Sequence, residues 1–298
     1  MFLRELGEKW LEVDGVRTRY FDEGQGQPVV FIHGGTIGDA SGGESARDFD
    51  LNFTPLSRDF RCIALDRLGQ GLTGLPARDA DYTMAASVRH AAGFLRALAA
   101  GPCHLVGHSR GAYVAARITL ENPGLVASCI LVDTATGAPG QGRNDILFAA
   151  NPHAPGTIDS ARFVYEKYSH APAAVTPEWL AMKQELSDLP KNREAARKMR
   201  DEGLLAARFL PDLVDDRDDL FARIAKDGLR RPVLLVWGYN DPTAPLDLGF
   251  NLFNLVASKQ KRTSLHVLNK AGHFSFRERA EAFNRVVADF VEGVDHGD

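Results

Sequence analysis

Short runs of consecutive apolar residues recur along the chain, separated by polar and glycine-rich segments. Because each run is continuous rather than alternating, it fits a strand that is buried on both faces, as in a parallel sheet. Residues 9–23 precede these runs and predict two strands joined by a tight turn at Asp14 and Gly15. The continuous runs span 28–33, 61–66, 103–108, 128–133, 232–238 and 264–268.

Helical patterns lie between several of these runs. Thr83 is a suitable N-cap for a helix that ends at Gly101 and Pro102. A second helix is expected over 109–122, and a third over about 276–292, where apolar residues form one stripe. Strands that alternate with helices predict βαβ units, and therefore a mostly parallel sheet covered by helices on both faces.

Residues 134–230 interrupt this alternation. The segment is polar and rich in helical patterns, and it contains no strong strand run. The alternation of strands and helices resumes directly at Arg231 and Pro232. We therefore expect a core made of residues 1–133 and 231–298, with residues 134–230 inserted as a helical cap, or lid, over the sheet edge. An independent helical domain is the alternative.

The composition is that of an ordinary globular protein with a sizeable core. Of the 298 residues, 44% are hydrophobic and 25% are charged, and the formal net charge is −4. Because the net charge is negative and the Lys and Arg residues are scattered, we expect no nucleic-acid partner. No window of about 18 uncharged apolar residues is present, so no membrane span is expected. Residues 1–10 carry charges where a signal peptide is apolar.

The three cysteines, Cys62, Cys103 and Cys129, each lie inside an apolar run. Their number is odd and their spacing is not that of metal ligands, which favours buried free thiols. Free thiols are typical of a reducing compartment, so we expect a cytoplasmic protein. Nothing in the sequence requires a metal ion or an organic cofactor.

The third continuous run leads into the sequence GHSRG, from Gly107 to Gly111. Ser109 thus lies at a predicted junction of strand and helix, where side chains at positions 107 and 111 would collide. The hydroxyl would be held at the C-terminal edge of the sheet, beside the positive end of a helix. The pattern alone arises often by chance, but a strand before it and a helix after it indicate a nucleophilic serine.

A nucleophilic serine requires a base, and the base requires an acid that fixes its tautomer. His273 follows the last predicted strand, directly ahead of the final helix, and so belongs to the same sheet edge. Asp241 and Asp133 both follow strands and are candidates for the acid. Asp241 is favoured because its Asn-Asp-Pro loop projects outward, whereas Asp133 is suited to bind backbone amides. His108 adjoins Ser109 and is expected to point elsewhere on the turn.

The oxyanion of such a reaction requires two aimed donors. One is the backbone N–H of Arg110, at the start of the second helix. The other is expected from the sequence HGGT after the first continuous run, through the N–H of Gly35 or Thr36. Glycines there let the backbone approach a substrate closely, although a merely flexible loop is the alternative. The loop continues to about residue 50, and we expect it to shape the substrate pocket.

These motifs together resemble the α/β-hydrolase family over nearly the whole chain. They are HGG at 33–35, DRLGQGLT at 66–73, GHSRG, WGYNDPTAP at 237–245 and AGH at 271–273. The C-terminal third, and ARFVYEKYS in the predicted cap, are similar to the meta-cleavage product hydrolases, which split a C–C bond in dienol keto acids made by ring-opening of catechols. The resemblance implies an α/β-hydrolase fold, a Ser109–Asp241–His273 triad, and oxyanion donors at Gly35 and Arg110.

The resemblance also implies a reaction in two parts. Ketonisation of the dienol creates an electron sink, and water or Ser109 then attacks the remote carbonyl so that the C–C bond breaks. The expected partner is a small-molecule substrate, and the family forms homodimers or higher homo-oligomers. A carboxylesterase or lactonase with the same three residues is the alternative function, and a ligand-binding protein that no longer turns over is a third.

Two departures from the family pattern concern the substrate. Phe274 stands where the family usually has a tryptophan, and a rough alignment puts Lys183 where the family often has an arginine that holds the substrate carboxylate. A solvated surface position is the alternative for Lys183. Trp179 belongs to a set of apolar cap residues that line the pocket or form the cap's own core. The candidate substrate-binding residues are therefore Gly34, Thr36, Trp179, Lys183 and Phe274.

Overall fold

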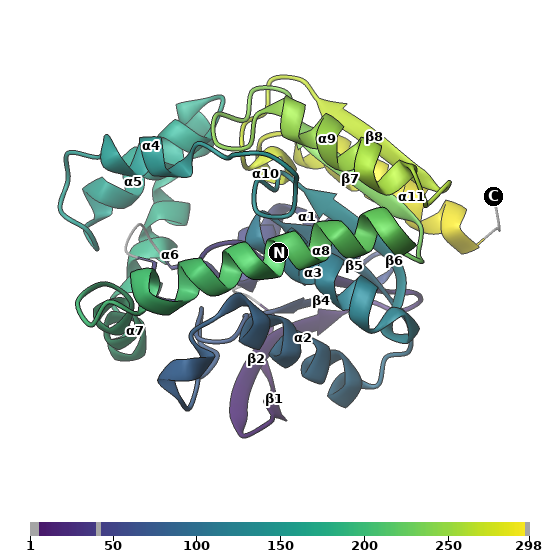
Figure 1. Cartoon of the computed structure of the whole chain (residues 1–298). Coiled ribbons are helices and arrows are strands. Elements are labelled where there is room, and N and C mark those ends of the chain that lie inside the picture. Colours follow the sequence, from purple (N-terminus) through teal and green to yellow (C-terminus); the bar gives the residue numbers. More distant parts are fainter. Residues whose placement is uncertain (1–5, 40–42, 296–298) are drawn as a thin grey trace.

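An eight-stranded sheet runs through the middle of the protein, with helices on both faces (Figure 1). The structure is a computed structural model and describes residues 6–39 and 43–295. Strand order is β1-β2-β4-β3-β5-β6-β7-β8, with antiparallel pairing at β1–β2 and β2–β4 and parallel pairing elsewhere. The strands are β1 (Lys9–Val13), β2 (Val16–Glu23), β3 (Pro28–Ile32), β4 (Arg61–Leu65), β5 (Cys103–His108), β6 (Val126–Val132), β7 (Val233–Gly238) and β8 (Thr263–Leu268).

The strands lie where the apolar runs predict them. Every residue of β5 and β7 is buried, as expected for a strand with helices on both faces. The edge strand β8 instead alternates between half-buried and exposed positions. The predicted hairpin is confirmed, because β1 and β2 pair antiparallel across Asp14 and Gly15, which both have positive φ. The predicted α/β class with a mostly parallel sheet is therefore confirmed.

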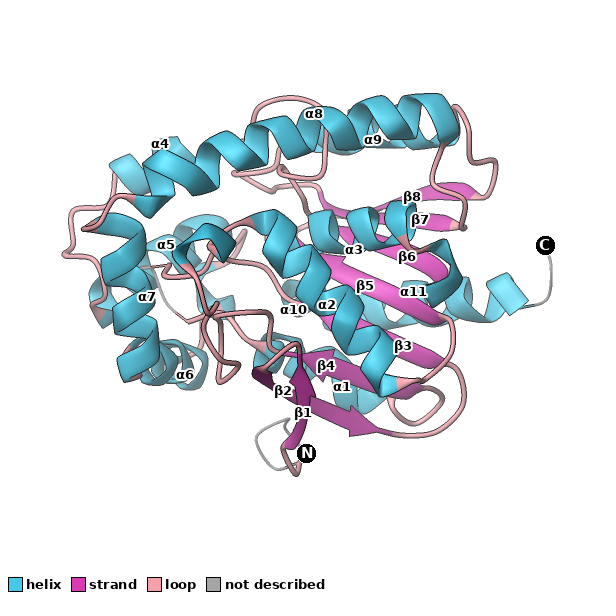
Figure 2. Cartoon of the chain, turned by 60° about the horizontal axis from the view of Figure 1, so that its bottom comes forward, coloured by secondary structure: helices cyan, strands magenta, loops and turns pink. Residues whose placement is uncertain are grey.

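Helices divide between the two faces of the sheet (Figure 2). One face carries α2 (Met84–Leu98), α3 (Arg110–Glu121) and α9 (Leu246–Ala257), and the other carries α1 (Asp50–Leu56) and α11 (Ala280–Asp295), which follows the short α10 (Ser275–Glu278). Thr83 caps α2 as predicted, with its side chain accepting a hydrogen bond from the N–H of Ala86. Among the described residues, no helix combines the length and the apolar character that a membrane span requires.

The insertion between β6 and β7 consists of helices, as predicted. It contains α4 (Asn144–Ala149), α5 (Ile158–Tyr168), α6 (Pro177–Ser187), α7 (Pro190–Arg200) and α8 (Leu210–Asp227). The first four gather beyond one end of the sheet, whereas α8 runs back along it (Figure 2). Leu220 and Ile224 of α8 join the core cluster beneath α2, α3 and α9. The division at residues 134 and 230 stays a prediction, and the packing of α8 favours a cap that ends before this helix.

The long loop after β3 and the N-terminal segment are described in part. Residues 40–42 of the loop and residues 1–5 of the N-terminal segment lie outside the described residues. On the far side of the gap, Ser45 begins a short 3₁₀ turn at Ala46–Phe49, whose Phe49 packs on Phe31 of β3. The segment from residue 43 onward is thus fixed against the sheet.

The turn from β5 into α3 is the tightest feature of the fold. Ser109 has φ 53° and ψ −122°, a conformation that side-chain-bearing residues rarely adopt. A Cβ at Gly107 would lie 2.4 Å from the carbonyl oxygen of Gly111, and a Cβ at Gly111 would lie 2.0 Å from that of Ile32. Both positions lack room for any side chain, which confirms the steric reason predicted for the two glycines.

We expect Gly111→Ala to lower the free energy of unfolding by at least about 2 kcal/mol, because the new methyl group overlaps rigid backbone. Gly124→Ala is the matched control, since a Cβ at Gly124 meets no atom within 4 Å. It should stay within about 0.5 kcal/mol of wild type. Urea unfolding followed by circular dichroism measures both. Equal stability of the two variants would contradict the account of the turn.

Candidate active site

Three polar side chains from separate loops meet beyond the C-terminal ends of β5, β7 and β8. The Nε2 atom of His273 lies 3.1 Å from the Oγ atom of Ser109, and its Nδ1 atom lies 2.7 Å from the Oδ2 atom of Asp241. The other oxygen of Asp241 accepts hydrogen bonds from the backbone and hydroxyl of Thr243 and from the N–H of Ala244, at 2.8–3.0 Å. The carboxylate is thereby fixed in orientation. This chain of contacts can pass the serine proton to the imidazole.

Asp133, the other candidate for the acid, does not contact the imidazole. Its Oδ1 atom accepts a hydrogen bond from the N–H of Gly238 at 2.6 Å, and its Oδ2 atom accepts one from the hydroxyl of Ser275. Burial raises the pKa of Asp133 well above its ordinary value, and the charge of Asp241 raises it further. Asp133 thus joins the end of β7 to the start of α10. The geometry places Asp241, rather than Asp133, against His273.

His108 is closer to the site than the sequence interpretation suggested. Its ring centroid lies 4.8 Å from that of His273, and its Nε2 atom donates a hydrogen bond to the backbone carbonyl of His273 at 2.8 Å. Burial lowers the pKa of His108 well below its ordinary value, and the adjacent His273 lowers it further. His108 is therefore a neutral group that holds the His273 loop. Its position directly before Ser109 gave no signal of this role.

The loop after β3 lies directly against the serine. A Cβ at Gly34 would come within 3.0 Å of the Cβ atom of Ser109, and Gly35 has φ 77°. The buried Arg67 guanidinium holds this loop by donating to the carbonyls of residues 33, 34 and 35. Arg110 begins α3, so its N–H belongs to the first helical turn, where N–H groups have no partner within the helix. Gly34 and Arg110 thus lie next to Ser109, and the assignment of the Gly35 and Arg110 N–H groups as oxyanion donors stays a prediction.

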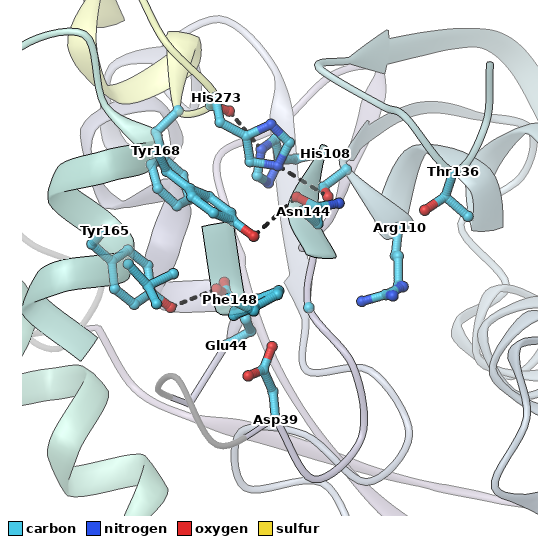
Figure 3. Close-up of a pocket in the computed structure, with 14 residues that line it drawn as sticks. Asp39, Glu44, His108, Arg110, Thr136, Asn144, Phe148, Tyr165, Tyr168 and His273 are labelled. Carbon is cyan, nitrogen blue, oxygen red and sulfur yellow. Dashed lines mark hydrogen bonds between the residues drawn. The ribbon is translucent and has the colours of Figure 1, made fainter. Parts of the chain in front are cut away.

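A pocket lined by Ser109 and His273 opens between the core and the helical insertion (Figure 3). The core contributes one side of its wall and the helices α4 and α5 contribute the other. Of the residues predicted to bind substrate, Phe274 lines the pocket, whereas Trp179 packs edge-on behind Phe274 at a ring distance of 4.9 Å. The lining consists of Gly35, Asp39, Glu44, His108, Ser109, Arg110, Thr136, Asn144, Phe148, Val164, Tyr165, Tyr168, His273 and Phe274.

Tyr165 and Tyr168 of α5 are lining residues to which sequence reasoning gave no role. The Tyr168 ring stands edge-on to the His273 ring, and its hydroxyl donates to the side-chain oxygen of Asn144 at 3.0 Å. Tyr165 stacks on Phe274 at 5.3 Å. The spacing of three residues on one helix was the available signal, because it puts both rings on the same face.

Lys183 is fully buried, so its alternative position on the solvated surface is wrong. Its Nζ atom lies 3.0 Å from Glu44 and 2.5 Å from Asp48, and it faces the rings of Tyr165 and Trp179. Trp179 donates to the same Asp48 carboxylate at 2.9 Å. The ammonium group is thus enclosed by two carboxylates and two aromatic rings within the wall. It does not line the pocket.

Glu44 is the charged member of this cluster that lines the pocket, together with the Tyr165 ring. It accepts a hydrogen bond from the Tyr165 hydroxyl at 2.6 Å (Figure 3). Burial raises the pKa of Glu44 to about 8, and the charge of Asp48 adds to this effect. Asp48 shows the opposite shift, because Lys183 and the hydrogen bonds around Asp48 outweigh its burial and hold its pKa well below the ordinary value. Asp48 therefore neutralises Lys183, and Glu44 carries a proton at neutral pH.

The cysteines lie away from this site. Cys62, Cys103 and Cys129 are buried and form no disulfide, which confirms the prediction of free thiols. Burial raises the pKa of Cys62, Cys103 and Cys129, so these thiols stay protonated. The described residues contain no group of three or more His, Cys, Asp or Glu side chains arranged to hold a metal ion.

Comparisons with known proteins agree over nearly the full length. Residues 29–286 match the model of the alpha/beta hydrolase family. A 2-hydroxy-6-oxononadienedioate/2-hydroxy-6-oxononatrienedioate hydrolase of Paraburkholderia xenovorans is 30% identical over 94% of this chain and 92% of its own. A 2-hydroxymuconate semialdehyde hydrolase of Pseudomonas putida is 28% identical over 98% and 96%. A solved meta-cleavage product hydrolase of Pseudomonas fluorescens superposes with a TM-score of 0.79 at 27% identity, covering 97% of this chain and 99% of its own.

The Glu44 cluster predicts a pH-dependent stability. Between its ordinary pKa of 4.5 and about 8, the folded protein holds a proton on Glu44 that the unfolded chain has lost. The free energy of unfolding therefore falls as pH rises through this window. Glu44→Gln imitates the protonated group, so its stability relative to wild type should improve by at least about 1 kcal/mol between pH 5 and pH 9.

Urea unfolding at several pH values measures this difference. Glu185→Gln, at an exposed position of α6, is the control and should follow the wild-type pH profile. A Glu44→Gln profile that runs parallel to wild type over the whole range would show that Glu44 does not hold the proton.

Proposed function

The chain belongs to the alpha/beta hydrolase family, and from this premise we propose that it is a serine hydrolase that cleaves a C–C bond in a 2-hydroxy-6-oxo-hexa-2,4-dienoate type compound. The observation that carries the proposal is the Ser109–His273–Asp241 chain of hydrogen bonds, whose serine and histidine line a pocket. Relatives named for hydrolysis of such meta-cleavage products, matched over nearly their whole length, support the substrate class.

The proposed reaction begins with ketonisation of the bound dienol. A proton leaves the 2-hydroxyl and another is added at carbon 5, which places a keto group where it can accept electrons. Ser109, or a water molecule deprotonated by His273, then attacks the carbonyl at carbon 6. The bond between carbons 5 and 6 breaks, and its electron pair moves toward the 2-keto oxygen. The C1–C5 fragment takes up a proton and leaves as a 2-hydroxydienoate. The carbon-6 fragment becomes a carboxylic acid, directly when water attacked and by hydrolysis of the acyl-serine when Ser109 attacked.

Each residue has a proposed role in this sequence. His273 takes the proton from the nucleophile and returns it to the product, while Asp241 holds the imidazole in the required tautomer. The backbone N–H groups of Gly35 and Arg110 donate to the oxyanion formed at carbon 6. Their position at a helix start and at a positive-φ glycine beside the serine supports this assignment.

The cellular location and the oligomeric state of the protein are also proposals. A cytoplasmic location is supported by three buried thiols that form no disulfide. A homodimer or higher homo-oligomer remains a prediction from the family resemblance. A carboxylesterase or lactonase is the second candidate function, because an ester carbonyl requires the same nucleophile and the same donors.

We expect the protein to bleach at least one coloured meta-cleavage dienolate, because C–C cleavage destroys the conjugated chromophore. Ser109→Ala should lower kcat by roughly 10³-fold or more. Absorbance decay at the dienolate maximum measures both. Rapid hydrolysis of 4-nitrophenyl esters, with no bleaching of any dienolate tested, would favour the esterase instead.

The choice between the two acids has its own test. Asp241→Asn should lower kcat by roughly 10³- to 10⁴-fold, because the amide favours the wrong imidazole tautomer. Asp133→Asn removes a carboxylate of the same kind that binds backbone amides, and it should cause a much smaller loss. Both variants are assayed by the same absorbance decay, with thermal unfolding as a check on folding. A larger loss in Asp133→Asn would reverse the assignment.

A further inference from the structure

The guanidinium of Arg110 is incompletely paired inside the pocket. Its Nε atom is shielded from solvent and has no hydrogen-bond partner. The side chain donates from NH1 to the hydroxyl of Thr36, which is a neutral acceptor. Burial lowers the pKa of Arg110, and the charge of Asp39 offsets this only in part.

This state contrasts with that of Lys183, a fully buried cation beside the pocket. Lys183 is in contact with two carboxylates and lies behind Tyr165 and Trp179. An anion entering the pocket would have to displace Glu44 to reach it. Burying a charged group whose polar atoms lack partners costs free energy. Arg110, unlike Lys183, has such an atom, its Nε.

The position of Arg110 fits the geometry of a dienoate. It directly follows Ser109, so the two side chains start from neighbouring Cα atoms. An extended arginine side chain spans about the same distance as the conjugated chain between a dienoate's carboxylate and its remote carbonyl. Figure 3 shows the Arg110 side chain on the side of the pocket opposite Tyr165 and Tyr168. An extended substrate with its carbonyl at Ser109 can therefore place its two ends on opposite walls.

We propose that Arg110 binds the substrate carboxylate through its unpaired guanidinium edge, in the role that the sequence alignment had suggested for Lys183. This inference rests on the proposed function. It orients the substrate with its carboxylate toward Arg110 and Thr136, and with the group on carbon 6 toward Tyr165 and Phe274. Arginine suits this role because its planar fork binds both oxygens of a carboxylate at once.

The test compares two esters of equal chain length, of which one carries a terminal carboxylate. These are mono-4-nitrophenyl adipate and 4-nitrophenyl hexanoate, and the readout is the ratio of their kcat/KM values. Arg110→Gln should lower this ratio about ten- to 100-fold, because a charge-assisted pair is lost for one ester only. Arg110→Lys should lower it by a smaller factor, since an ammonium group keeps the charge but not the fork.

Arg117→Gln is the matched control. Arg117 lies on the same helix as Arg110, but it pairs with Asp219 and Glu121 outside the pocket, so the ratio should not change. An unchanged ratio in both Arg110 variants, with the two esters losing rate equally, would overturn the inference. Thermal unfolding shows whether each variant folds. If Arg110→Gln does not fold, the ratio measured for Arg110→Lys tests the inference by itself.

The ester ratio also separates this inference from the proposed function. If no dienolate is bleached but the ratio falls in Arg110→Gln, C–C hydrolysis is wrong and carboxylate binding at Arg110 stands. If dienolates are bleached and the ratio does not change, the proposed function stands and Arg110 is not the anchor. If dienolates are bleached and the ratio falls, as expected, Arg110→Gln should also raise the KM for the dienoate by a larger factor than it lowers kcat.

Discussion

The backbone turn at Ser109 is the constraint on which the site depends. A non-glycine residue held at positive φ costs on the order of 1–3 kcal/mol and persists only where its surroundings determine it. Here the surroundings are backbone atoms packed against backbone atoms at Gly107 and Gly111, beside a strand buried along its whole length. The Ser109 N–H also donates to the carbonyl of Val132 on β6. These contacts fix the backbone from which the hydroxyl projects toward the imidazole.

The imidazole depends on a second set of contacts, which join the core to the cap. The N–H of His273 donates to the carbonyl of Tyr168 in α5 at 2.8 Å. The Glu278 carboxylate accepts from Gly272, next to the histidine, and from His170 and Ala171, which follow α5. The loop that carries His273 is thus bonded within a few residues to the cap and to Glu278 at the end of α10. Because of these bonds, a displacement of the cap would also displace His273. The position of the cap and the alignment of His273 with Ser109 are therefore coupled.

Local signals predicted the sheet and the three central residues, and they could not predict the pocket wall. Ser109, Asp241 and His273 each follow a continuous apolar run, and parallel strands bring such positions to one edge. The sequence favoured Asp241 but kept Asp133 as a candidate for the acid, because both follow strands. Which carboxylate reaches His273 depends on how β6 and β7 pair and on where the loops after them turn. Lys183 and Trp179 were placed near the substrate, but their partner Asp48 lies more than a hundred positions away in the sequence. Residue spacing cannot predict a contact between positions so far apart in the sequence. The burial of Lys183 and Trp179 beside Asp48 could therefore be seen only in the structure.

Lys183 and Arg110 show how charge is distributed around the pocket. A buried ion pair adds little stability when compared with well-packed apolar groups, but removing one partner from it is strongly destabilising. The Lys183 cluster obeys this rule internally, because Asp48 supplies the compensating charge and Glu44 holds a proton in hydrogen-bond contact with Tyr165. These contacts hold α5 and α6 of the cap on the loop after β3, and they leave no free charge facing the substrate. Arg110 is compensated only in part by the charge of Asp39, and its Nε atom is enclosed and has no hydrogen-bond partner. The site therefore pairs Lys183 fully and leaves Arg110, beside the nucleophile, incompletely paired. This difference is what the proposed binding of the substrate carboxylate at Arg110 would use.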